Sequence, residues 1–443
     1  MKILFIADVG SIHVARWVNQ LHGTGWDFRV FQPVPSSFGV RGEFLSGRIY
    51  LPYDVHKPDS VRVEYTLIPK PPGLIIRVFR KVLRKFKITL FDENPPGLAT
   101  RAIRKGLRIL KMIPLEESPP SSPETIHARF LADLIRKWKP DVIHSLGIFS
   151  FWRDNGIVLL RAREILGGRL PCPWIVSSWG ADLDLYPYLG KKEQAEAEAI
   201  LMTCDGLLVE GERDLDLAQK LGFHGKVLAK LPAYGGITWK PQDYCTPGLT
   251  SSRRVILLKG RDNTDHVLAG GDPQGRAMTA IKVFKMHQDL LKSYSIIITQ
   301  ATPSVEAEAK ALIAGGMDIT IYPNSMSLPY EQWLKLLGSA RILIAVTASD
   351  GLPSTLIEAM SLGVFPIHSG LETVREWIND GENGLLVAPE DVQAVAQALR
   401  NAIENDAMVD NAAEHNLQLI AKKFSDSIVR PQVIDLYKRL GQS

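Results

Sequence analysis

Short apolar segments alternate with helical patterns along most of this chain, and this alternation constrains the fold more than any other feature. The apolar segments of the first half are residues 2–6, 141–144, 174–177 and 206–209, and its helical patterns cover 125–138 and 214–221. The apolar segments of the second half are residues 254–258, 294–299, 318–322, 342–346, 365–367 and 385–387. Strands separated by helices form parallel sheets, so we predict an α/β fold.

The length of the chain and one irregular stretch predict two domains. A chain of 443 residues exceeds one ordinary hydrophobic core. Residues 231–249 carry three prolines and three glycines without a regular period, which indicates a linker. We therefore expect a first domain over 1–235, a linker over 236–250, a second domain over 251–424 and a helical tail over 425–443. Ligands of such sheets bind at the carboxyl ends of the strands.

The stretch SDGLPSTLIEAMSLGV at 349–364 carries the clearest chemical pattern. Asp350 follows an apolar strand, and Glu358 comes eight positions later on a predicted helix. Pro353 suits the first turn of that helix, because its missing N–H costs little there. The free backbone amides of the same turn can bind a phosphate.

A ligand lying over that helix start would meet Asp350 at one end and Glu358 at the other. A nucleoside diphosphate sugar has matching parts, namely sugar hydroxyls, a pyrophosphate and ribose hydroxyls. We predict that Asp350 contacts the donor sugar and that Glu358 contacts the ribose. The turn and the helix start would bind the donor between them, through Gly351, Leu352, Pro353, Ser354 and Thr355.

The spacing of Asp350 and Glu358 resembles the E-x7-E signature of glycosyltransferase family 4, with Asp in place of the first Glu. The resemblance extends to HSGLETVREWINDGENGLLVAPED at 368–391, to the opening MKILFIADVGSIHVARWVNQL and to PDVIHSLGIF at 140–149. It implies the GT-B fold, in which two Rossmann-like parallel-sheet domains face each other across a cleft. It also implies sugar transfer from a nucleotide donor to a hydroxyl acceptor with retention of configuration, and a tail that packs back on the first domain.

The family places two cations after the first strand of the second domain, where they stabilise the departing diphosphate. Here that strand ends in Lys259 and Arg261, and Arg276 opens the next helix where the family usually has Lys. The resemblance implies that Arg276 and one of the other two form the diphosphate clamp. The alternative is that they are surface cations at strand and helix ends. Tyr322 lies at the position where the family contacts the base of the nucleotide, largely through backbone groups.

The loop and helix after the first strand present Gly10, Ser11, His13 and Arg16, which suit contact with donor or acceptor. His13 could instead be a structural histidine. The loop has one glycine, so the G-x-G-x-x-G fingerprint is absent and NAD or FAD binding is disfavoured.

A later turn of the first domain resembles the family's HG-x-D turn, whose His touches the donor sugar. Trp179 replaces that His, so its role is not carried over, while Asp182 keeps a position that can bind acceptor or sugar. His144 at the end of PDVIH points toward the cleft in this interpretation. The alternative for His144 is a strand-end histidine in a satisfied hydrogen-bond network.

Asp182-Leu183-Asp184 matches the D-x-D metal motif of single-domain glycosyltransferases, and Asp214-Leu215-Asp216 shows the same spacing. We interpret both as coincidence and expect no essential metal and no cofactor besides the nucleotide-sugar co-substrate. Three cysteines show neither metal-ligand spacing nor a disulfide framework, which suits a reducing cytosol. No apolar run approaches the roughly 20 residues of a membrane helix.

The net charge of +4 is mild, but basic residues gather in 75–111. Apolar residues recur there at helical spacing between arginines and lysines, which suits the surface of an anionic membrane leaflet. A solvated helix face is the alternative, and nucleic acid ranks last because no recognised binding motif accompanies the charge. A saccharide or lipid-linked saccharide acceptor in cell-envelope polysaccharide or lipopolysaccharide assembly would explain the pattern.

Two hypotheses compete with sugar transfer. Asp350 and Trp179 depart from the family pattern, and both departures would suit a non-catalytic GT-B-like subunit that binds nucleotide sugars. A GT-B epimerase acting on a nucleotide sugar would use the same cleft.

Overall fold

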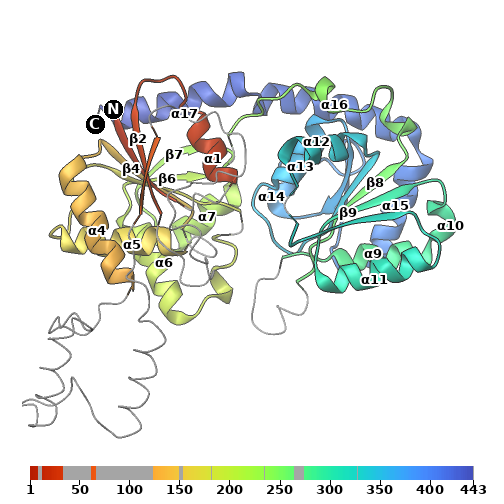
Figure 1. Ribbon diagram of the computed structural model, residues 1–443, viewed down its shortest axis with the longest axis horizontal. Coiled ribbons are helices and arrows are strands. Elements are labelled where there is room, and N and C mark those ends of the chain that lie inside the picture. Colours follow the sequence, from red (N-terminus) through yellow and green to blue (C-terminus); the bar gives the residue numbers. More distant parts are fainter. Residues whose placement is uncertain are drawn as a thin grey trace, which may run out of the picture.

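The computed structural model describes residues 1–7, 12–32, 61–65, 123–148, 153–180, 182–233, 235–263, 274–326 and 328–442. These residues form two parallel α/β domains, and the last two helices of the chain run across both (Figure 1). Gly10, Ser11 and the basic segment 75–111 lie outside the described residues. Within the described part, no helix combines the length and the hydrophobicity needed to cross a bilayer.

The first domain contains a seven-stranded parallel sheet in the order β3-β2-β1-β4-β5-β6-β7. Its strands are β1 (Lys2–Ile6), β2 (Asp27–Gln32), β3 (Val61–Tyr65), β4 (Val142–Leu146), β5 (Trp174–Ser177), β6 (Gly206–Val209) and β7 (Lys226–Lys230). Its helices are α1 (Ile12–Asn19), α4 (Pro123–Trp138), α5 (Arg153–Ile165), α6 (Lys191–Thr203) and α7 (Glu212–Lys220). Side chains of β1 alternate between the two faces. Leu4 and Ile6 pack with α4 and α5, whereas Ile3 and Phe5 pack with α1.

The second domain contains a six-stranded parallel sheet in the order β10-β9-β8-β11-β12-β13. Its strands are β8 (Val255–Lys259), β9 (Ser295–Ala301), β10 (Ile319–Pro323), β11 (Ile342–Ala345), β12 (Phe365–Ser369) and β13 (Leu385–Val387). Its helices are α9 (Ala277–Met286), α10 (Gln288–Leu291), α11 (Pro303–Ala314), α12 (Tyr330–Ser339), α13 (Ser354–Ser361), α14 (Glu372–Arg375), α15 (Val392–Glu404) and α16 (Asp406–Phe424).

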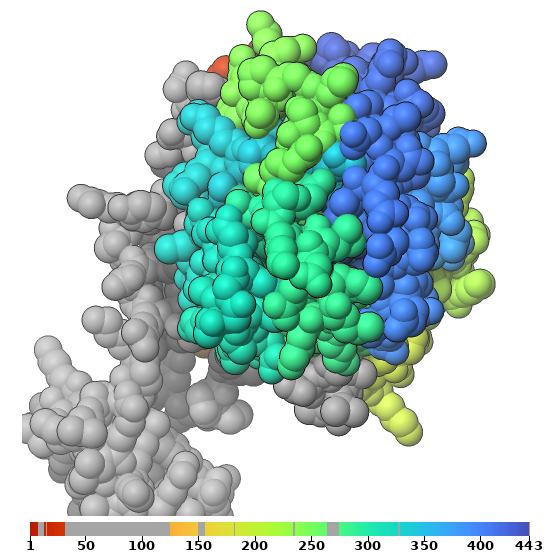
Figure 2. Space-filling view, turned by 90° about the vertical axis from the view of Figure 1, so that its right-hand side faces the viewer, coloured from red at the N-terminus to blue at the C-terminus, as the bar shows by residue number. Residues whose placement is uncertain are grey.

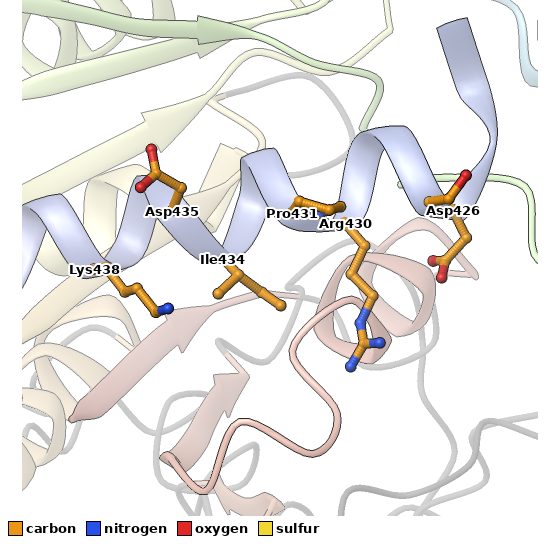
Figure 3. A pocket seen from close by; sticks show the side chains of 7 residues that line it. Asp426, Arg430, Pro431, Ile434, Asp435 and Lys438 are labelled. Atoms are coloured by element: carbon orange, nitrogen blue, oxygen red, sulfur yellow. The ribbon is translucent and has the colours of Figure 1, made fainter. Parts of the chain in front are cut away.

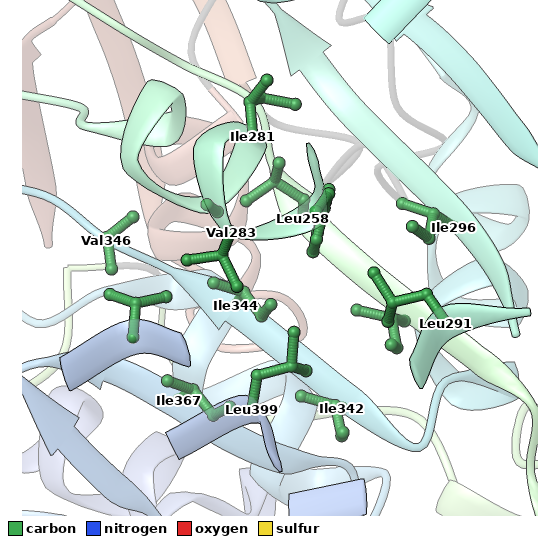
Figure 4. Close-up of a cluster of buried hydrophobic side chains, with 14 of the residues drawn as sticks. Leu258, Ile281, Val283, Leu291, Ile296, Ile342, Ile344, Val346, Ile367 and Leu399 are labelled. Atoms are coloured by element: carbon green, nitrogen blue, oxygen red, sulfur yellow. The ribbon is translucent and has the colours of Figure 1, made fainter. Parts of the chain in front are cut away.

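The two faces of the second sheet carry different hydrophobic clusters. Leu258 and Ile344 point to the face covered by α9, α11 and α15 (Figure 4). Leu257 and Leu343 point to the opposite face, which α12 covers. Because both faces are buried, these strands are nearly continuous apolar runs, as parallel sheets require.

The connection between the domains packs against the C-terminal helices. The segment before β8 lies beside α16 (Figure 2), where Ser251 donates its backbone N–H and its hydroxyl to Asp410 at 2.9 and 2.7 Å. The last helix, α17 (Asp426–Leu440), returns to the first domain. There Val433 and Tyr437 are buried with Ile3 and Phe5, so the C-terminal segment completes the core of the N-terminal domain.

Candidate functional site

The carboxyl ends of β8, β11 and β12 bring charged residues together, since these strands are neighbours in one parallel sheet. The Lys259 Nζ lies 3.4 Å from the Asp350 Oδ2, so the structure joins two of the predicted site residues. His368, near the end of β12, is buried beside them. The pKa of His368 is lowered to about 4, mainly by burial and in part by the positive charge on Lys259.

Helix α1 of the first domain faces this cluster with His13 and Arg16, which lie one turn apart on one side of the helix. Val14 and Trp17 face the core instead. Burial lowers the pKa of His13 to about 4; the positive charges of Arg16 and Lys259 also lower it, and the carboxylate of Asp350 raises it. His13 is therefore neutral at pH 7 and lies within electrostatic reach of the second domain.

Trp179 lies beside His13, with ring centroids 6.1 Å apart and an edge-on geometry. The residue that replaces the expected histidine thus packs against a histidine from a different element, at the face between the domains.

Glu358 is buried on α13 and receives hydrogen bonds from three side chains. Arg16 of the first domain forms an ion pair with its Oε1 at 2.9 Å. Tyr330 donates its hydroxyl to the same oxygen at 2.8 Å, and Trp333 donates its indole N–H to Oε2 at 2.7 Å. Both predicted residues, Arg16 and Glu358, therefore meet across the domain boundary.

The turn before α13 makes a close backbone contact with the first domain. A Cβ on Gly351 would lie 2.4 Å from the Gly180 Cα, so a side chain at Gly351 has no room. Pro353 is the N-cap of α13, and Ser354 and Thr355 at the helix start are partly exposed. Of the predicted donor-binding turn, Gly351 thus lies in the domain contact, whereas the first helical residues keep access to solvent.

Glu210, which follows β6, is a central residue of this contact that sequence reasoning missed. Its carboxylate accepts the backbone N–H groups of Gly180 at 2.8 Å, Ala233 at 3.1 Å and Leu352 at 3.3 Å. Burial raises the pKa of Glu210 to about 8, although these amide bonds oppose the shift. A carboxylate directly after a buried strand is the sequence signal that could have found it.

Arg213 makes a second polar contact that sequence reasoning missed. It donates to the carbonyl oxygen of Asp350 at 2.8 Å and pairs with the buried Asp214 at 2.7 Å. Its guanidinium also lies 3.6 Å from Asp184, which accepts the hydroxyl of Ser349. Asp184 and Asp214, one from each D-x-D match, thus take part in contacts that fix α7 and the loop after β11 against each other.

Arg261 and Arg276 lie in the connection between β8 and α9. Arg276 is the N-cap of α9 and pairs with Glu390 at 2.9 Å, and the Glu390 side chain is 73% exposed. Arg261 donates to Gln274 at 3.3 Å. Gly275 between them has φ +78°, and a Cβ there would lie 2.5 Å from the Arg261 oxygen, so glycine is required. Lys259 is the predicted cation that contacts Asp350 directly.

Two predicted cleft residues are instead part of the interior of the first domain, which corrects those predictions. His144 is fully buried; its Nδ1 contacts the Tyr437 hydroxyl at 2.5 Å and its Nε2 the Ser177 hydroxyl at 2.7 Å. The satisfied-network alternative therefore applies. Asp182 accepts the backbone N–H groups of Ile148 at 2.9 Å and Trp179 at 3.3 Å. These two hydrogen bonds hold the loop after β4 against the turn at Trp179. Burial raises the pKa of Asp182 well above its ordinary range.

Tyr322 and the pocket along α17 lie apart from these contacts. Tyr322 is half-buried on β10, the edge strand of the second sheet. The pocket has a volume of about 320 Å³ and is lined by Asp426, Ser427, Arg430, Pro431, Ile434, Asp435 and Lys438 (Figure 3). Arg430 donates to the carbonyl oxygen of Gln20 at 3.0 Å, and Asp435 pairs with Arg439 at 3.0 Å. None of the predicted site residues lines this pocket.

Two Rossmann-like parallel sheets whose domains face each other, with polar residues at the strand ends, define a GT-B protein, as predicted. Sucrose-phosphate synthase from Thermosynechococcus elongatus superposes with a TM-score of 0.62 at 14% identity and covers 99% of both chains. HepE from Anabaena, solved with UDP and glucose, gives 0.60 at 12% identity over 99% of this chain and 100% of HepE. At these identities the likeness establishes the fold.

Residues 304–419 match the sequence model of the family described as glycosyl transferases group 1. O-antigen chain mannosyltransferase B of Escherichia coli is 29% identical over 119 residues, which are 27% of this chain and 29% of that protein. D-inositol 3-phosphate glycosyltransferase of a Nocardioides species is 24% identical over 236 residues, 45% of this chain and 46% of that protein. The matches thus span less than half the length of these relatives.

Proposed function

We propose that this chain is a retaining glycosyltransferase of family 4, which moves a sugar from a nucleoside diphosphate donor to a hydroxyl acceptor. One observation carries the proposal: Lys259 and Asp350, 3.4 Å apart at adjacent strand ends, face His13 and Arg16 of the other domain. The family match over 304–419 supports it, since that stretch contains Asp350 and Glu358. HepE, of the same fold, was solved with UDP and glucose, which supports a nucleotide-sugar donor.

In the proposed reaction the bond between the anomeric carbon and the diphosphate oxygen breaks. The acceptor oxygen bonds to that carbon, and the hydroxyl proton leaves. Lys259 and Arg276 supply positive charge where the diphosphate gains negative charge. The backbone amides at Ser354 and Thr355 support the same group at the partly exposed start of α13. Asp350 contacts the donor sugar, and Glu358 the ribose hydroxyls.

The sequence and the relatives support a proposal for the setting of the reaction. We propose that the chain acts in cell-envelope polysaccharide or lipopolysaccharide assembly, on a saccharide or lipid-linked saccharide acceptor. The curated relatives include a capsular polysaccharide glycosyltransferase of Staphylococcus aureus, 20% identical over 157 residues, which supports this setting. We also propose a cytoplasmic location at the inner membrane face, through the basic residues of 75–111, and transfer without an essential metal.

The test measures release of nucleoside diphosphate from a panel of nucleotide sugars, with membrane extract as the acceptor source. Wild-type protein is expected to release diphosphate from at least one donor. Lys259→Ala is expected to lower turnover about 10²- to 10³-fold, because it removes charge from the leaving group. The matched control is Lys292→Ala, since the Lys292 side chain is 76% exposed and pairs with Asp289 of α10, the helix that Lys292 caps.

Three results would contradict the proposal. Full turnover by folded Lys259→Ala protein would remove Lys259 from the mechanism. Donor binding without release would favour the non-catalytic subunit. Epimerised donor formed without any acceptor would identify an epimerase.

A further inference from the structure

The carboxylate of Glu358 is held from two directions, and the two sets of donors belong to different domains. Tyr330 and Trp333 lie on α12 in the same domain as Glu358. Arg16 lies on α1 in the other domain and donates to Oε1 at 2.9 Å. Tyr330 and Trp333 therefore stay with Glu358 if the domains move, whereas Arg16 does not.

Tyr330 and Trp333 are three residues apart on α12, so their side chains share one face of that helix. The tyrosine hydroxyl binds Oε1 at 2.8 Å, and the indole N–H binds Oε2 at 2.7 Å. Because each oxygen has its own donor, the carboxylate cannot rotate about its terminal torsion without losing a bond. A carboxylate offers about four acceptor sites and three side chains donate to this one, so a position for a further donor remains.

We propose that Tyr330 and Trp333 are positioning residues that hold Glu358 in the orientation that receives the ribose hydroxyls of the donor. This inference rests on the proposed function and extends it to two side chains that the E-x7-E spacing does not contain. Loss of the indole N–H frees Oε2 and lets the carboxylate turn away from the ribose. Loss of the tyrosine hydroxyl leaves Oε1 with Arg16 of the other domain as its donor, so the orientation of the carboxylate then depends on the position of that domain.

Trp239 offers a matched control from the same cluster. Its ring packs edge-on against Tyr330, with centroids 5.6 Å apart. Its indole N–H is buried and has no hydrogen-bond partner among the described residues. Trp239→Phe and Trp333→Phe thus make the same chemical change in neighbouring places, and only the second removes a bond to Glu358.

The experiment measures, by calorimetry, the affinity of each variant for two forms of one nucleotide. The probes are whichever of UDP, GDP or ADP binds wild-type protein most tightly, and its 2′,3′-dideoxy counterpart. Trp333→Phe is expected to weaken binding of the ribonucleotide about tenfold, as for the loss of a hydrogen bond to a charged group, and to leave the dideoxy form unchanged. Tyr330→Phe is expected to act in the same direction, and Trp239→Phe to change neither affinity.

A second comparison separates positioning from general packing. In a Glu358→Ala background, Trp333→Phe is expected to have no further effect, because the group that it positions is gone. Equal loss of both nucleotides in Trp333→Phe, or no loss, would overturn the inference while wild-type protein still prefers the ribonucleotide. A wild-type protein that binds no nucleotide, or binds both forms equally, would overturn the proposed function and this inference together.

Discussion

At the residue scale, the site consists of charged side chains that form ion pairs with residues far away in the sequence. Lys259 and Asp350 pair at 3.4 Å, with side chains about a fifth exposed, so ligand and solvent can reach them. Glu210 is buried instead, and its side chain accepts hydrogen bonds from three backbone amides. One carboxylate is thus available for chemistry, and the other maintains the contact between the domains.

The pKa of Glu210 predicts a pH dependence of stability. Its folded pKa of about 8 lies above the ordinary value of 4.5, so between these pH values the folded state binds a proton that the unfolded state has lost. The free energy of unfolding therefore falls as pH rises through this window. Glu210→Gln removes the effect, so its stability relative to wild type is expected to rise by about 1.4 kcal/mol per pH unit.

Urea denaturation of both proteins at pH 5, 6, 7 and 8 checks the Glu210 prediction. A difference in unfolding free energy that stays constant, or that falls toward pH 8, would show that Glu210 is ionised in the folded protein.

Contacts between neighbouring strand ends of one sheet can be predicted from the sequence, whereas contacts with the other domain cannot. Lys259 and Asp350 could be placed together because each follows an apolar strand of the same sheet. The bond between Glu210 and Leu352 spans 142 residues and two domains, and no local pattern encodes it. His144 was ambiguous because its tyrosine partner lies 293 residues away, on α17.

At the element scale, α1 and α13 meet through Arg16 and Glu358. The predicted segments 174–177, 206–209 and 385–387 coincide with β5, β6 and β13, whereas β2 and β3 were not predicted. Residues 226–230 (KVLAK) form β7 and were not predicted, because two lysines interrupt the apolar pattern. Such charged strands are typical of sheet edges, where β7 lies.

The contact between α1 and α13 predicts a measurable coupling energy. Arg16→Ala and Glu358→Gln, alone and together, are expected to show a coupling of about 1–3 kcal/mol in the free energy of unfolding, since the pair is largely buried. The control cycle uses Arg136 and Asp133, whose side chains are about half exposed, and is expected to give less than about 1 kcal/mol. Equal coupling energies in both cycles would show that the interdomain pair stabilises the fold no more than an exposed surface ion pair does.

At the scale of the whole molecule, the C-terminal helix binds the chain into one unit. The Tyr437 hydroxyl accepts the indole N–H of Trp17 at 2.9 Å and contacts the His144 Nδ1 at 2.5 Å. Between α16 and α17 the chain is hydrogen-bonded to the interdomain linker. The Ile237 N–H donates to the Phe424 carbonyl oxygen at 2.7 Å, and the Asp426 N–H donates to the Ile237 carbonyl oxygen at 2.9 Å. The stability of the first domain therefore depends on the last residues of the chain.

Removal of the Tyr437 hydroxyl tests this dependence. Tyr437→Phe removes the buried hydroxyl that binds the Trp17 indole N–H and the His144 Nδ1, so the unfolding free energy is expected to fall by about 2–3 kcal/mol. Tyr188→Phe is the control, because Tyr188 is 56% exposed. Denaturation followed by tryptophan fluorescence measures both, and an unchanged midpoint for Tyr437→Phe would show that the buried network adds no stability.

The central claim is that an anionic donor binds at the start of α13, between Lys259 and Glu358. A crystal structure with the nucleoside diphosphate that binds most tightly tests it directly. We expect phosphate oxygens within hydrogen-bonding distance of the Lys259 Nζ and of the backbone amides at Ser354 and Thr355, with the ribose hydroxyls on Glu358. A nucleotide bound elsewhere, with Arg16 still on Glu358 and Lys259 still on Asp350, would contradict it.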